Sequence, residues 1–211
     1  MLLFLPNERL DAPKGAGGFV RNIKRFYPSV LGMLLLMICF FIFPTNFSAV
    51  CVRTTNLDPI AVTIIMVALD VVAALVGVAF GGMMRRFRLS VKYFAPTSFL
   101  LGYLCFATSQ SLPSLLVGCL FIGIANGIGV PYLNTIASIK AGQDAATTVM
   151  PLLSAALYAG QFLSPLVATP LAAKFFPGNV LGIYWIACAF SVLFLLEVFA
   201  TRHSQALPPE E

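Results

Sequence analysis

The sequence predicts an all-α membrane protein with six transmembrane helices, and two observations support this fold class. Charged residues make up 10% of the 211 residues and hydrophobic residues 59%, whereas soluble domains carry about 25% charged residues. Apolar runs long enough to cross ~30 Å of hydrocarbon as helices recur along the whole chain. Inside lipid only helices and closed barrels satisfy the backbone, and the sequence lacks the alternation of barrel strands. The composition therefore excludes an ordinary soluble domain.

Six apolar segments, separated by short breaks that contain Pro, Asn or Gly, define the predicted helices. The segments span residues 28–50, 60–83, 91–110, 113–136, 146–172 and 178–200. Together they predict one transmembrane bundle over residues 27–201, followed by a polar tail over residues 202–211.

Residues 1–26 differ from the bundle that follows them. Residues 1–6 are apolar but too short for a signal-peptide core, and we interpret them as the last turn of a preceding membrane helix. The basic, glycine-containing stretch after them predicts a flexible cytoplasmic linker.

The positions of the basic residues predict the orientation of the bundle. Eleven of the 13 Lys and Arg fall on one side of the predicted membrane: Arg9, Lys14, Arg21, Lys24, Arg25, Arg85, Arg86, Arg88, Lys92, Lys140 and Arg202. Only Arg53 and Lys174 fall on the other side. Basic residues favour the cytoplasmic side, so both termini are expected in the cytoplasm of a multi-pass protein of the plasma or inner membrane. The net charge of +5 therefore reflects topology, and no nucleic-acid partner is expected.

The sequence offers few residues for catalysis or for a metal site. Its single histidine, His203, lies in the polar tail, and its five cysteines show no Cys-x-x-Cys pairing. No Gly-x-Ser-x-Gly or His-Glu-x-x-His motif is present. We therefore expect no enzyme, no catalytic residue, no metal and no cofactor. Cys51, just past the first predicted helix, is expected to react with reagents from outside the cell.

Asp70 is the first candidate functional residue, because it lies near the middle of the second predicted helix. An ionised carboxylate at that depth costs at least ~2.5 kcal/mol. At 100° per residue it shares a face with Ala73, Gly77 and Gly81, a row that permits close helix packing. Two interpretations remain open: a carboxyl that handles a proton, an ion or the solute, and a structural carboxyl bonded to a neighbouring helix.

Five further polar residues are candidates for lining a solute pathway. Ser154, Tyr158 and Gln161 recur on one face of the fifth predicted helix. Asn126 lies in the fourth helix, beside a Gly-x-x-x-Gly row, and Asn46 follows Pro44 in the first. For the stripe on the fifth helix, hydrogen bonding between helices explains the pattern equally well.

The third and sixth predicted helices carry few polar residues and are expected to face lipid. In the sixth, Glu197 lies near the cytoplasmic interface, and Tyr184 and Trp185 suit an aromatic belt on the opposite side. Polar residues therefore concentrate in the first, second, fourth and fifth helices, a distribution that repeats with a period of three.

These features resemble the C-terminal half of a major facilitator superfamily transporter. The resemblance spans the whole chain and is carried by three short motifs. The loop after the second helix, with Gly81, Arg85, Arg86 and Arg88, is similar to the family's Gly-x-x-x-Asp-Arg-x-Gly-Arg-Arg gating loop. Gly81 and Arg86 match that pattern, whereas Arg85 replaces the acid and Arg88 replaces the second glycine. Residues 123–131 and 160–165 are similar to the family's glycine-rich and Gly-Gln-x-x-x-Pro runs.

The resemblance implies a 3+3 inverted-repeat bundle that forms half of a twelve-helix secondary transporter. The solute would bind near the midplane, between this bundle and an N-terminal six-helix half or a second copy, with a proton as a candidate coupling ion. A non-transporting six-helix membrane protein, either a remnant or an accessory subunit, is the alternative. None of the motifs identifies the solute.

Overall fold

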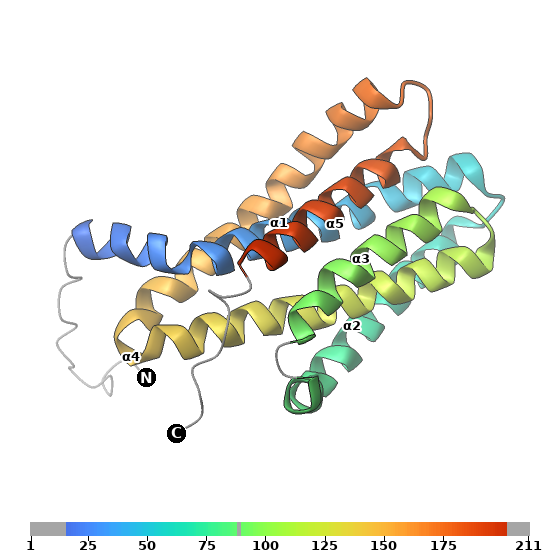
Figure 1. Cartoon of the computed structure of the whole chain (residues 1–211). Helices are drawn as coiled ribbons and strands as arrows, with labels where there is room; N and C mark the ends of the chain where they lie inside the picture. Colours follow the sequence, from blue (N-terminus) through green and yellow to red (C-terminus); the bar gives the residue numbers. More distant parts are fainter. Residues whose placement is uncertain (1–15, 88–89, 202–211) are drawn as a thin grey trace, which may run out of the picture.

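The computed structural model describes residues 16–87 and 90–201, and these residues form helices joined by short turns, without a strand (Figure 1). The helices are α1 (Ala16–Thr54), α2 (Pro59–Phe87), α3 (Val91–Thr108), α4 (Leu112–Phe175) and α5 (Gly182–Ala200). The predicted all-α fold is therefore confirmed.

The label α4 covers two of the predicted helices. A straight helix of its 64 residues would be ~96 Å long, about three times the thickness of the hydrocarbon core. Instead the chain folds back between Leu112–Ala141 and Ala145–Phe175, and the returning half reaches α1 (Figure 1). The predicted helices at 113–136 and 146–172 are thus both present, joined by helical backbone where a loop was expected.

Five helical segments of the described chain are long and apolar enough to cross a membrane. They are Phe26–Thr54, Pro59–Phe87, Leu112–Ala141, Ala145–Phe175 and Gly182–Ala200. The remaining helix, α3, has 18 residues, and its Lys, Tyr, Ser and Thr side chains make it less apolar. The helices identify a membrane protein, with five spans of clear length and apolarity where six were predicted.

The start of α1 differs from the predicted boundary. The helix begins at Ala16, inside the segment expected to be a linker. The helix end predicted for residues 1–6 and the tail at 202–211 lie outside the described residues.

Aromatic side chains from α1, α3 and α5 pack together in the core. The ring centroid of Phe106 lies 5.2 Å from that of Tyr184 and 5.6 Å from that of Phe43. Tyr103 stacks 6.2 Å from Tyr184, and its hydroxyl donates a hydrogen bond to the carbonyl oxygen of Cys39. The aromatic belt expected at Tyr184 is therefore wrong, because that ring is fully buried. It packs against α3 instead.

Burial is uneven among the helices. In the most apolar stretch of each span, 61% of the residues are buried in Phe26–Thr54 but only 17% in Pro59–Phe87 and 28% in Ala145–Phe175. Cys51, near the end of α1, is buried. Its expected reaction with reagents from outside the cell is therefore wrong. The α1 span is thus the most covered of the five, and α2 and the second half of α4 are the least covered.

Candidate functional site

Asp70 lies in the middle of α2, and its side chain is exposed. The other charged residues of this span, Arg85 and Arg86, lie in its last turn. The exposed residues near Asp70 include Val67, Val71 and Ala74, so the carboxyl is surrounded by apolar surface on its own helix. An exposed carboxyl at this depth cannot face lipid without a large cost, and it therefore requires water or a polar partner.

α2 packs against the first half of α4 through two glycines. A methyl group placed on Gly123 would lie 2.9 Å from the carbonyl oxygen of Leu69, and one on Gly127 would lie 2.5 Å from that of Ala73. Backbone oxygens cannot move aside as a flexible side chain can, so only glycine permits this approach. The contact places Asp70 beside the interface between the two helices.

Asn126 lies between these two glycines and is half-buried. Its Oδ1 atom is buried and accepts no hydrogen bond. A buried acceptor without a donor costs about 1–3 kcal/mol. Asn126 therefore offers an unused acceptor close to the surface that Asp70 occupies.

The stripe predicted on the fifth helix lies on the exposed face of Ala145–Phe175. Ser154, Tyr158 and Gln161 are all exposed, and the Ser154 hydroxyl donates to the carbonyl oxygen of Met150 at 3.1 Å. The opposite face packs on α1, where the Ser164 hydroxyl donates to the carbonyl oxygen of Ile38 at 3.0 Å. The stripe is therefore directed away from the bundle core.

Asn46 satisfies its amide locally. Its Nδ2 atom donates to the carbonyl oxygen of Ile42 and to the hydroxyl oxygen of Thr45, both at 2.9 Å. These bonds lie within α1, where Pro44 leaves backbone acceptors to be shared. Asn46 is not bonded to any of the other predicted site residues.

The predicted gating residues lie in the last turns of α2. Gly81, Arg85 and Arg86 are exposed, and a methyl group placed on Gly81 would meet nothing within 4 Å. Arg88 lies outside the described residues. Gly81 is therefore not required here for close packing against another described helix.

Among the described residues, no hydrogen bond joins any two of the predicted site residues. The structure does bring Asp70 and Asn126 to neighbouring helices, whereas Ser154, Tyr158 and Gln161 occupy a separate exposed face. Within the described residues, no group of three His, Cys, Asp or Glu side chains is placed to hold a metal ion.

Two buried charged residues were not selected from the sequence. Glu197 is 8% exposed, and its Oε1 atom accepts a hydrogen bond from the Thr201 hydroxyl at 3.2 Å. Its Oε2 atom is buried and has no hydrogen-bond partner. Glu197 lies in the last turn of α5, and its Oε2 atom is directed toward Gly32 of α1, so the interfacial position expected for it stays a prediction. The sequence signal that could have indicated this contact is the spacing of four residues, one helical turn, between Glu197 and Thr201.

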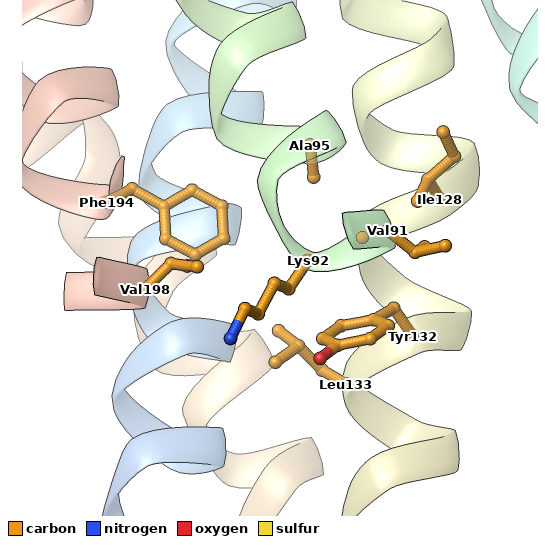
Figure 2. A pocket seen from close by; sticks show the side chains of 9 residues that line it. Val91, Lys92, Ala95, Ile128, Tyr132, Leu133, Phe194 and Val198 are labelled. Carbon is orange, nitrogen blue, oxygen red and sulfur yellow. The ribbon is translucent and has the colours of Figure 1, made fainter. Parts of the chain in front are cut away.

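Lys92 of α3 is the second buried charged residue, at 7% exposed. Figure 2 shows its side chain entering a small cavity between α3, α4 and α5, next to Tyr132, Leu133 and Val198. The cavity has room for about one water molecule. None of the predicted site residues lines it, so this cavity lies apart from the Asp70 surface.

Comparisons with known proteins add no relative to this picture. No family model, no curated protein and no solved structure matches the chain.

Proposed function

We propose that the chain is one half of a secondary transporter for a small solute, of the major facilitator type. The observation that carries the proposal is the exposure of Asp70 in the middle of an apolar span. Lipid disfavours a carboxyl at that depth, whereas a water-lined solute pathway accommodates one.

The location of the other exposed polar groups supports the same proposal. Ser154, Tyr158 and Gln161 lie on the second half of α4, which like α2 is poorly covered. Apolar surface would suffice if both helices faced only lipid. In this proposal, the polar positions line one wall of a pathway, and a second six-helix bundle supplies the other wall.

Reconstitution tests this proposal directly. The purified 211-residue chain is placed in liposomes with and without a co-expressed N-terminal six-helix half, and uptake of labelled sugars, amino acids and organic acids is measured. We expect saturable uptake of one class only when both bundles are present. Saturable uptake by the chain alone, at one copy per liposome, would contradict the half-transporter assignment. No uptake with both bundles would favour the non-transporting alternative.

We propose further that both termini lie in the cytoplasm, from the distribution of Lys and Arg. Because Cys51 is buried, the reporter is instead Asn56→Cys, in the exposed turn between α1 and α2. It should react with a membrane-impermeant thiol reagent in intact cells. Reaction only after the cells are opened would reverse the orientation.

A further inference from the structure

The helix contact beside Asp70 fixes the relation between Asp70 and Asn126. Leu69 of α2 lies beside Gly123 of α4, and Ala73 lies beside Gly127. Both residue numbers increase together along the contact, so the two helices run parallel there.

Along a helix, each residue is rotated by about 100° from the one before it. In two parallel helices, the residue after a contact residue on one helix and the residue before a contact residue on the other therefore point to the same side of the contact. Asp70 follows Leu69, which faces α4, and Asn126 precedes Gly127, which faces α2. The two side chains therefore flank the same side of the α2–α4 interface, offset by two residues or about 3 Å along the helix axis.

The chemistry of the two groups is complementary when the carboxyl is protonated. A protonated carboxyl has one O–H donor, and an amide oxygen accepts hydrogen bonds. Oδ1 of Asn126 is buried without a donor. The Asp70 side chain is exposed and engaged in no hydrogen bond of the described structure, so its carboxyl is available to form one.

Among the side chains that the structure describes, no charged group on a neighbouring helix lies near the middle of its span, as Asp70 does. The helices that contact α2 are α1, α3 and α4. Their described charged side chains lie near the ends of the apolar segments: Arg53 on α1, Lys92 at the start of α3, and Lys140 and Lys174 at the ends of Leu112–Ala141 and Ala145–Phe175. The titratable side chains Tyr103 and Tyr132 are buried in the core, and Tyr158 lies on the exposed face of the second half of α4.

We propose that Asp70 and Asn126 form a proton-binding pair, in which the protonated carboxyl of Asp70 donates a hydrogen bond to Oδ1 of Asn126. Loss of the proton leaves a carboxylate that the amide oxygen repels, so the side chain turns back to the exposed surface. This inference rests on the proposed function and deepens it, because it makes the proton the coupling ion and the α2–α4 interface its binding site.

Infrared spectroscopy of the full chain in lipid tests the pair without a solute. A protonated carboxyl has its own carbonyl stretch, and donation of its O–H to a partner lowers the frequency. We expect this band in Glu197→Gln, which removes the buried carboxyl of α5, and its loss when Asp70→Asn is added to that variant. In Asn126→Leu the band should persist at higher frequency, because its partner is gone.

Two results would overturn the pair: a carboxyl band that Asp70→Asn leaves unchanged, or a band that does not move in Asn126→Leu. If Asn126→Leu fails to assemble, Asn126→Ala adds no volume and makes the same comparison. The outcome is independent of transport. Solute uptake without an Asp70 band would reject the pair and retain the transporter. An Asp70 band without uptake by the reconstituted complex would retain the pair and reject the transporter.

Discussion

Polar groups are buried and hydrogen-bonded on one side of the bundle and exposed on the other. Where α1, α3 and α5 meet, Tyr103 is fully buried and its hydroxyl is bonded to the backbone of α1. On α2 and the second half of α4, Asp70 and Tyr158 are exposed, and no hydrogen bond of theirs appears among the described residues. The first side is a packed core in which the Tyr103 hydroxyl is bonded within the chain. The second side is a surface that is apolar enough for a membrane but carries polar groups that lipid does not satisfy.

The two acids of the described spans show the same contrast. Glu197 is buried near the end of α5, against Thr201 and the backbone of α1. Asp70 is exposed in the middle of α2. A buried acid near a helix end can serve the packing of the bundle, whereas an exposed acid at mid-span requires something outside it.

Removal of one aromatic ring from each side should give the largest difference between them. Tyr103→Ala deletes a fully buried ring that stacks on Tyr184, and we expect a loss of about 3–5 kcal/mol in unfolding free energy. Phe162→Ala deletes a ring that is 68% exposed and should change stability by no more than about 0.5 kcal/mol. Thermal unfolding of both variants in detergent provides the comparison. Equal losses would show that the α4 face is also packed within the chain.

Addition of a methyl group should have a smaller effect of either sign. Gly127→Ala places a methyl group 2.5 Å from the backbone oxygen of Ala73, and overpacking of this kind costs about 1–3 kcal/mol. Gly82→Ala meets nothing within 4 Å and should stabilise the helix by up to about 1 kcal/mol. The two melting temperatures should move in opposite directions. A tolerated Gly127→Ala would mean that α2 and α4 are not in close contact.

Removal of a single hydroxyl should have the smallest measurable effect. Tyr103→Phe loses the hydrogen bond to the carbonyl oxygen of Cys39, which is worth about 1 kcal/mol. Tyr158→Phe removes an exposed hydroxyl and should leave the stability of the isolated chain unchanged. The same unfolding measurement applies. A destabilised Tyr158→Phe would place that hydroxyl in a contact within the chain.

The helices were predictable from the sequence because each apolar run is long and bounded by breaks. The helical join between the two halves of α4 was not predictable, because a short turn can keep helical backbone bonds while it reverses the chain. The environment of α5 could not be predicted for a different reason. Almost every residue of that helix is apolar, so no periodicity indicates which face is buried, and Tyr184 was therefore expected in an aromatic belt although its ring is buried.

For the candidate site, the sequence predicted which residues are unusual but not how they are related. Asp70 is conspicuous because it is a lone acid in an apolar run. Its relation to Asn126 depends on the parallel contact between α2 and α4 at Gly123 and Gly127, which is a property of the packing. The exposure of Gln161 likewise depends on which face of the second half of α4 contacts α1.

Thiol accessibility along α2 tests the central claim most directly, because it separates a solute pathway from a lipid-facing surface. Thr63, Val67 and Ala74 lie within about 60° of Asp70 around the helix, whereas Ile64 and Leu75 lie about 120–140° away. All five are exposed in the structure.

Each is replaced by Cys, one at a time, in a chain whose native cysteines are replaced by Ala, and the complete membrane-embedded protein is treated with a water-soluble thiol reagent. The account predicts reaction at Thr63→Cys, Val67→Cys and Ala74→Cys and protection at Ile64→Cys and Leu75→Cys. Protection at all five positions would show that the Asp70 face meets no water, and would contradict the transporter.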